Sequence, residues 1–246
     1  MENLVDIEMV DGIATITLDS PSNRNALSQR LLADFHLALD KAEGDNARAV
    51  VLTHTAPVFC AGADLKERST GLVDSTSYVR AIERLGTTAA PVIAAVDGPV
   101  RAGGIGLMAA CDLVVINASI TFAFTEVRIG VAPAIVTAPV MQRCNWSKLA
   151  GPYLTGEVFG ATRALEMGLV THVSDDVAAT VDDLCRQILA GGPNAVAATK
   201  SLLRAPRSMA ELQALSESMF TSEEGREGMA AFAEKRPPRW ASGLTQ

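Results

Sequence analysis

The alternation of apolar and polar residues changes between strand-like and helix-like several times along the chain. Two alternating segments, residues 5–9 and 13–18, flank Asp11-Gly12, a dipeptide that favours a two-residue hairpin turn. Ser28 then precedes apolar residues spaced three and four apart up to about Glu43, which predicts a capped amphipathic helix. The chain is therefore expected to begin with a hairpin followed by a helix.

Short apolar runs and helical segments alternate through the middle of the chain. The predicted strands are residues 49–53, 92–96, 113–116, 120–124 and 169–173, and the predicted helices are residues 78–85 and 105–110. Strands that alternate with helices in this way are typical of a layered α/β core.

The last part of the chain has only helical periodicity. The predicted helices are residues 175–189, 195–203, 209–219 and 223–235. We therefore place a boundary near residue 190, with an α/β core over residues 1–190 and a helical region over residues 191–246.

Composition narrows the possible partners and the compartment. With 246 residues, 48% of them hydrophobic and 20% charged, the chain can bury a substantial core. A formal net charge of -7 argues against a nucleic-acid or anionic-membrane surface. No apolar run reaches the ~18 residues of a membrane span, and the acidic start lacks the features of a signal peptide. We expect a cytoplasmic protein.

Cysteine usage predicts no metal site. Cys60, Cys111, Cys144 and Cys185 form no Cys-x-x-Cys pair and have no histidine at ligand spacing. A nucleophilic role for Cys60 would need a neighbouring base. Because none of the three histidines lies in a motif that would supply one, a small buried thiol is the favoured interpretation.

Two turns of small residues each follow an apolar strand-like run. The first contains Ala61-Gly62-Ala63 and the second contains Ala102-Gly103-Gly104. Such turns leave backbone N–H groups uncovered, and two amides that converge on a carbonyl oxygen stabilise an enolate or a tetrahedral species. The second turn also precedes a predicted helix, whose N-terminus adds positive potential. A dinucleotide-binding motif is excluded, because Gly103-Gly104-Ile105-Gly106 lacks its glycine spacing.

Four ordered motifs carry a family resemblance. They are Asn25-Ala26-Leu27-Ser28, Ala61-Gly62-Ala63-Asp64-Leu65-Lys66, Ala102-Gly103-Gly104, and Ala110-Cys111-Asp112 followed by Phe122-Ala123-Phe124-Thr125-Glu126. The chain resembles the enoyl-CoA hydratase/isomerase (crotonase) superfamily. The resemblance implies an α/β spiral of strand-strand-helix turns, with C-terminal helices that form a homotrimer or a dimer of trimers.

The resemblance also implies roles for three residues of the expected active site. The amides of Ala63 and Gly103 would form the oxyanion hole, and Glu126 would be the acid/base. Its apolar neighbours favour a raised pKa, although an ion pair with Arg128 is the alternative. Family hydratases carry a second glutamate where this chain has Gly106. Double-bond isomerisation needs one base, whereas hydration of an enoyl thioester favours two carboxylates, and both reactions stay open.

The resemblance places coenzyme A, as part of the substrate, beside several named residues, and no separate cofactor is expected. The candidate contacts are Arg24, Ala26, Ala61, Asp64, Leu65 and Lys66, with Lys235 and Trp240 from a C-terminal tail that often comes from a neighbouring subunit. Asp64 is also predicted to cap the turn at Ala63. The alternative function is a catalytically silent acyl-CoA-binding protein, suggested by Gly106 and by the bulky residues 134–136.

Overall fold

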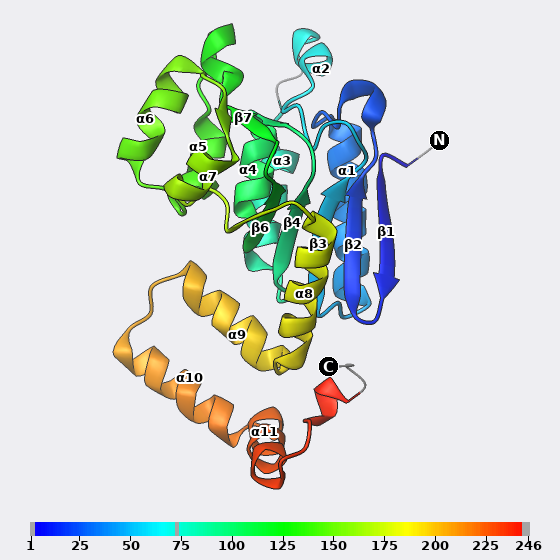
Figure 1. Cartoon of the computed structure of the whole chain (residues 1–246), viewed down its shortest axis with the longest axis vertical. Coiled ribbons are helices and arrows are strands. Elements are labelled where there is room, and N and C mark those ends of the chain that lie inside the picture. The colour runs from blue at the N-terminus through cyan, green and yellow to red at the C-terminus, as the bar shows by residue number, and fades with distance from the viewer. Residues whose placement is uncertain (1–2, 72–73, 243–246) are drawn as a thin grey trace.

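A mixed six-stranded sheet forms the centre of the molecule (Figure 1). This computed structural model describes residues 3–71 and 74–242. The strand order is β1-β2-β3-β4-β6-β9, where only the first pair is antiparallel. The strands are β1 (Val5–Val10), β2 (Ile13–Leu18), β3 (Ala49–His54), β4 (Val92–Val96), β6 (Leu113–Asn117) and β9 (His172–Ser174).

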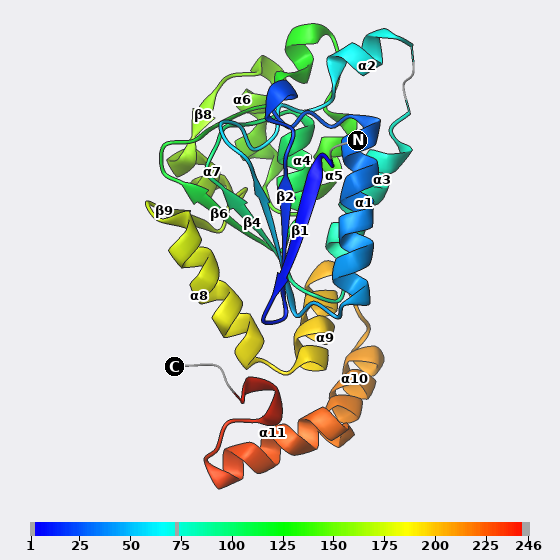
Figure 2. The ribbon, with the colours of Figure 1, turned by 90° about the vertical axis from the view of Figure 1, so that its right-hand side faces the viewer.

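Helices cover both faces of this sheet (Figure 2). One face carries α1 (Gln29–Gly44), α3 (Thr76–Thr87) and α4 (Gly103–Ala110), and the other carries α8 (Val177–Ala190). Within β3, Val50 and Leu52 pack with the first group, whereas Val51 packs with the cluster that includes Val181 of α8. Because successive side chains of a strand point to opposite faces, the apolar run of β3 serves two cores.

A second, smaller sheet lies beside the first and carries the segment that contains Glu126. Its strands are β5 (Val100–Arg101), β7 (Thr121–Ala123) and β8 (Phe159–Gly160), in the order β5-β7-β8. Near it lie α5 (Ala134–Met141), α6 (Trp146–Thr155), α7 (Ala161–Met167) and the 3-10 turn η2 (Thr125–Ile129). The short helix α2 (Leu65–Ser69) lies at the same end of the molecule, on the side of α1. The architecture is the predicted α/β class with two mixed sheets and C-terminal helices.

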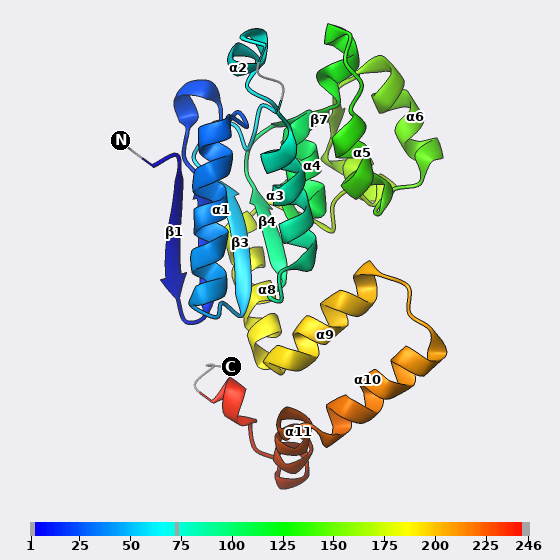
Figure 3. The same ribbon diagram turned by 180° about the vertical axis from the view of Figure 1, so that it is seen from behind.

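The C-terminal helices extend from the opposite end of the molecule (Figures 1 and 3). They are α9 (Pro193–Arg204), α10 (Met209–Thr221) and α11 (Glu223–Glu234), followed by the 3-10 turn η3 (Arg239–Ala241). In the part of the chain that the structure describes, no helix combines the length and apolar character needed to cross a membrane.

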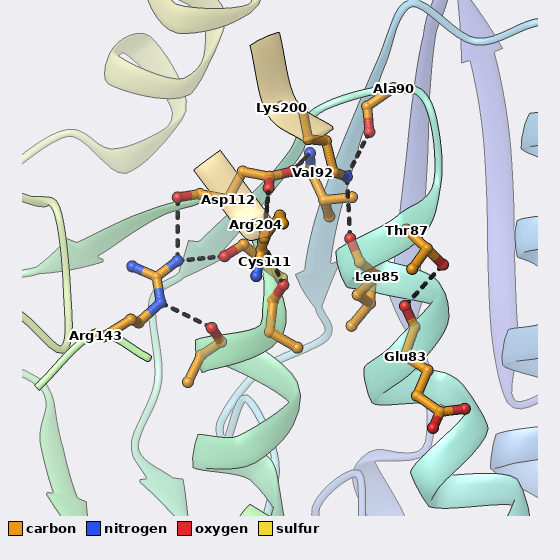
Figure 4. A network of polar contacts seen from close by, with 12 residues as sticks. Glu83, Leu85, Thr87, Ala90, Val92, Cys111, Asp112, Arg143, Lys200 and Arg204 are labelled. Carbon is orange, nitrogen blue, oxygen red and sulfur yellow. Dashed lines mark hydrogen bonds and ion pairs between the residues drawn. The ribbon is translucent and has the colours of Figure 1, made fainter. Parts of the chain in front are cut away.

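A buried ion-pair network fixes α9 to the core (Figure 4). Lys200 Nζ lies 2.8 Å from Asp112 Oδ2 and donates to the main-chain oxygens of Leu85 and Ala90. Arg204 approaches the other carboxylate oxygen of Asp112 at 2.6 Å. Lys200 is only 6% exposed, so a buried ammonium group is matched by one carboxylate and two carbonyl oxygens.

Candidate active site

The two small-residue turns lie in direct contact with each other. Gly62 has a φ of +92°, and a Cβ at this position would lie 2.8 Å from the Cβ of Ala102 and 3.3 Å from the nitrogen of Gly103. The N–H of Leu27 donates to the carbonyl oxygen of Gly62 at 2.8 Å. Glycine is therefore required at position 62, both for its backbone conformation and for the close approach of the second turn.

The structure brings the two predicted oxyanion amides into these adjacent turns. Gly103 is the first residue of α4, so its N–H has no partner in the helix ladder. Ala102 before it has φ 48° and ψ -123°, a conformation that is costly for a residue with a side chain. Within the described residues, neither the Ala63 amide nor the Gly103 amide donates to another backbone group.

The next glycine has a packing role. A Cβ at Gly104 would lie 2.7 Å from the Cβ of Cys60, so α4 can approach the first turn only if residue 104 lacks a side chain. Cys60 is fully buried, and burial raises the pKa of its thiol to about 12. The thiol stays protonated at neutral pH, and the interpretation of Cys60 as a small buried residue is confirmed.

Glu126 reaches the site through the pairing of β5 with β7. Arg101 pairs with Ala123, and the N–H of Ala102 donates to the carbonyl oxygen of Ala123 at 3.0 Å. The strand that leads into Gly103 is thus bonded to the strand that leads into Glu126. Since η2, which carries Glu126, begins two residues after Ala123, it begins close to the start of α4.

The carboxyl group of Glu126 is partly removed from water. Its Oε2 is buried and has no hydrogen-bond partner in the described parts of the chain. Loss of solvation raises the pKa of Glu126 above its ordinary value. No ion pair joins Glu126 to Arg128 in residues 3–71 and 74–242. A carboxyl group whose pKa is raised by burial is a stronger proton acceptor, once ionised, than one in water.

Gly106 faces the hydroxyl of Tyr78, a residue that the sequence did not mark as functional. A Cβ at Gly106 would fall well inside the van der Waals radius of Tyr78 Oη and 3.3 Å from the Cα of Val136. Tyr78 Oη itself donates to the carbonyl oxygen of Gly103 at 2.6 Å. We expected only a helix at Tyr78, and no local motif identifies its contact with α4.

Six of the predicted coenzyme A contacts lie around the first turn. The N–H of Ala61 donates to the carbonyl oxygen of Arg24 at 3.0 Å. Asp64 is the N-cap of α2, where its Oδ1 accepts from the N–H of Lys66 at 2.9 Å. A capping role was predicted for Asp64 at the turn of Ala63, and the structure shows that Asp64 caps the short helix that follows this turn. Arg24, Leu65 and Lys66 are exposed, whereas Ala26, Ala61 and Asp64 are buried or half-buried.

The segment that follows α11, which contains the two predicted tail residues, lies at the end of the molecule opposite α2 (Figures 1 and 3). Lys235 ends α11 in a left-handed conformation with φ 55°. The indole N–H of Trp240 donates to the carbonyl oxygen of Ala190 at 3.1 Å. Within one chain the structure therefore does not bring Lys235 and Trp240 together with Ala63, Gly103 and Glu126.

The described residues contain no group of three or more His, Cys, Asp or Glu side chains arranged to hold a metal ion. The arrangement of adjacent amides at two turns, with a partly desolvated carboxyl group beside them, can stabilise a developing oxyanion and move a proton. These are the elements of enolate chemistry at a carbonyl group.

Comparison with known proteins gives one family over almost the whole chain. The enoyl-CoA hydratase/isomerase family model matches residues 8–243. An enoyl-CoA hydratase of Mycobacterium tuberculosis is 31% identical over 92% of this chain and 91% of its own. The crystal structure of an enoyl-CoA hydratase from Mycobacterium avium is 40% identical, with a TM-score of 0.77 over 98% of this chain and 100% of that one.

A more distant sequence gives a closer overall superposition. The structure of an enoyl-CoA hydratase/isomerase from Marinobacter aquaeolei has a TM-score of 0.89 at 27% identity, over 97% of this chain and 99% of that one. The chain therefore belongs to the enoyl-CoA hydratase/isomerase (crotonase) superfamily and is an enzyme of that type acting on an acyl-CoA.

Proposed function

We propose that the protein acts on an enoyl-CoA thioester through an enolate, with Glu126 as its single acid/base residue. The thioester oxygen would accept hydrogen bonds from the amides of Ala63 and Gly103, which lowers the energy of the developing negative charge. The observation that carries the proposal is the buried, unpartnered Oε2 of Glu126, on a turn that follows the strand paired with the start of α4.

Two reactions are compatible with this arrangement. In isomerisation of a 3-enoyl thioester, the Glu126 carboxylate removes a proton from C2 and the resulting acid returns it to C4, which leaves a 2-enoyl thioester. In hydration of a 2-enoyl thioester, Glu126 would also have to activate the water that adds to C3. Isomerisation passes through a dienolate, whereas hydration passes through the enolate of a 3-hydroxyacyl thioester that is then protonated at C2. In both, the negative charge on the thioester oxygen would be stabilised by the same two amides.

The coenzyme A portion of the substrate is proposed to bind around the first turn. Lys66 and Arg24 supply exposed cations for phosphate groups. The turn between them is bonded to Arg24 at Ala61 and approaches Gly103 at Gly62. Lys235 and Trp240 would contribute from the tail of a neighbouring subunit, since their own chain holds them at its far end.

The assembly is proposed to be a homotrimer or a dimer of trimers. Large apolar side chains are exposed on the C-terminal helices, and such surfaces mark protein contacts. They are Leu203, Met209, Phe220 and Phe232, each at least 65% exposed. Sedimentation velocity tests the proposal, because a monomer at micromolar concentration would contradict it. The cytoplasmic location stays a prediction.

Substitution of Glu126 by Gln tests the catalytic proposal. Isomerisation of a 3-enoyl-CoA and hydration of crotonyl-CoA would be measured for both proteins. Turnover of the better substrate should fall at least ~100-fold, because the general acid/base is lost. Affinity for a saturated acyl-CoA, measured by calorimetry, should stay within about twofold, because the amides that bind the thioester are unchanged. A Gln variant with wild-type turnover would remove Glu126 from the mechanism.

A further inference from the structure

Tyr78 connects α3 to the first turn of α4. Its side chain is 7% exposed, and its hydroxyl donates to the carbonyl oxygen of Gly103 at 2.6 Å. Gly103 is the residue whose N–H is the proposed oxyanion donor. A short hydrogen bond from a buried hydroxyl to this residue restricts the orientation of the turn that presents the amide.

The same hydroxyl closes the space in front of position 106. Gly103 and Gly106 are three residues apart on α4 and share one face of the helix. A Cβ at Gly103 would lie 3.5 Å from Tyr78 Oη, which is ordinary contact, whereas a Cβ at Gly106 would overlap with it. On the far side, the Cα and Cγ2 of Val136 would each lie 3.3 Å from that Cβ. Any side chain at position 106 therefore requires Tyr78 to move.

The Tyr78 hydroxyl cannot act as the second acid/base group that a glutamate at position 106 would supply. Burial, followed by the neighbouring Cys60 and Glu126, raises the pKa of Tyr78 well above its ordinary value, so the phenol stays protonated. A hydroxyl has one proton to donate, and the carbonyl oxygen of Gly103 already accepts it. The group can accept a hydrogen bond, but it is not a second general base.

We propose that Tyr78 is a positioning and specificity-determining residue, which holds Gly103 in place and fills the space where a second acid/base carboxylate would stand. The reaction is then restricted to chemistry that Glu126 can perform alone, so that a double-bond shift is favoured over addition of water. This inference rests on the proposed function.

A double-mutant cycle tests the contact without any substrate. Gly106→Ala should lower the Tm of the wild type by about 5 °C, the scale of overpacking in a domain of this size. In a Tyr78→Phe background, which lacks Oη but keeps the ring, the same change should lower the Tm by less than half as much. Tyr153→Phe is the matched control, since Tyr153 is the chain's other tyrosine and also has a buried hydroxyl. An equal loss in all three backgrounds would overturn the proposed contact.

Kinetics test the consequence for the reaction. Tyr78→Phe should lower kcat for 3-enoyl-CoA isomerisation about tenfold, the effect of one lost hydrogen bond, while KM stays within about twofold. The ratio of crotonyl-CoA hydration to isomerisation should rise at least ~10-fold in Tyr78→Phe/Gly106→Glu relative to each single variant, because a second carboxylate then has room. An unchanged ratio would overturn the specificity role.

The two experiments separate this inference from the proposed function. A wild-type protein that turns over neither substrate would contradict the proposed function, and with it the selectivity assigned to Tyr78. The stability cycle would in that case still report whether Tyr78 and position 106 exclude each other. A positive kinetic result without coupling in the stability cycle would show that the gain of hydration does not come from this contact.

Discussion

Asn25 Nδ2 lies 2.8 Å from the carbonyl oxygen of Val58, and the two residues belong to different loops beside the first glycine turn. The same amide group donates to the carbonyl oxygen of Thr55 at 3.2 Å, and Oδ1 accepts from the N–H of Ser20 at 2.7 Å. Asn25 is fully buried. One side chain thus fixes the loop before α1 to the loop after β3, from which the chain continues to Gly62.

Asn25→Asp should destabilise the protein by at least ~3 kcal/mol. The substitution removes two hydrogen-bond donors and places a buried carboxylate against two carbonyl oxygens. Asn46→Asp is the matched control, because Asn46 is exposed and has nearly the same φ, 55° against 53° for Asn25. Urea denaturation of both variants gives the comparison. Similar losses of unfolding free energy in the two variants would show that the backbone conformation, and not the hydrogen bonds of Asn25, determines the cost.

Asp112→Asn should cost about 3–5 kcal/mol of unfolding free energy, because it leaves the buried Lys200 without its counter-charge. The control is Asp45→Asn, which removes an exposed pair with Lys41 at 2.7 Å and should cost at most ~1 kcal/mol. Denaturant unfolding monitored by circular dichroism measures both changes. A cost for Asp112→Asn no larger than that of the control would mean that water reaches Lys200.

The raised pKa of Glu126 predicts a pH dependence of stability with a definite sign. The folded state holds this proton more tightly than the unfolded chain does. The stabilisation is fully present below the pKa of the unfolded chain and is lost as the pH rises through the higher pKa of the folded state. Glu126→Gln stays neutral, so its Tm relative to wild type should be higher at pH 8 than at pH 4.

Thermal unfolding at several pH values measures this difference, and Glu157→Gln serves as the control. Glu157 lies on the surface in a pair with Arg163 at 2.7 Å, so its loss should lower the Tm at pH 8. The same Glu126 titration should appear in the kinetics of the wild type, as turnover that rises with pH when the carboxylate forms. A Tm difference for Glu126→Gln that does not change between the two pH values would contradict the burial of its charge.

Deletion of the chain from Glu234 onward should weaken the affinity for an acyl-CoA about tenfold, if the tail contributes one charged or stacking contact to the ligand. Calorimetry with a saturated acyl-CoA measures the affinity, and sedimentation shows whether the assembly persists. Trp240→Phe is the comparison variant, since it keeps an aromatic side chain but loses the indole N–H bond to Ala190. Unchanged affinity after deletion would exclude a role for the tail in binding.

The parts of the fold that local patterns determine were predictable from the sequence. The hairpin turn at Asp11-Gly12 has the positive φ angles that this dipeptide favours. Ser28 Oγ accepts from the N–H of Leu31 as the expected helix cap. The strand expected at residues 169–173 is instead β9 (His172–Ser174). Leu169 and Val170 are buried in the core, but they precede the residues that pair with β6.

Helices with interrupted patterns were harder to predict. The helices α5 and α6 contain Pro139 and Pro152 in their interiors, residues that usually indicate a break. The helix α4 begins at Gly103, two residues before the predicted start, since glycine lowers helix propensity. That early start matters, because it makes the Gly103 amide the first N–H of the helix.

The candidate site also contains residues that a local sequence pattern identifies and residues that it does not. Motifs that are contiguous in the sequence identified the two turns and Glu126, which the fold brings together. The contact of Tyr78 with Gly103 spans 25 positions, and that of Asn25 with Val58 spans 33. No local sequence pattern identifies either pair, because each contact depends on how α3 and the loops pack in the folded chain.

The ribosome synthesises the acceptors of the Lys200 network before it synthesises Lys200 itself. Lys200 donates to Leu85 and Ala90 across 115 and 110 positions. At ~5–20 residues per second, a ribosome completes these acceptors many seconds before it adds the lysine. Until then water must solvate the Asp112 carboxylate and the surface that α9 later covers. A nascent chain that ends near residue 190 therefore lacks the ammonium group that neutralises Asp112 in the complete protein.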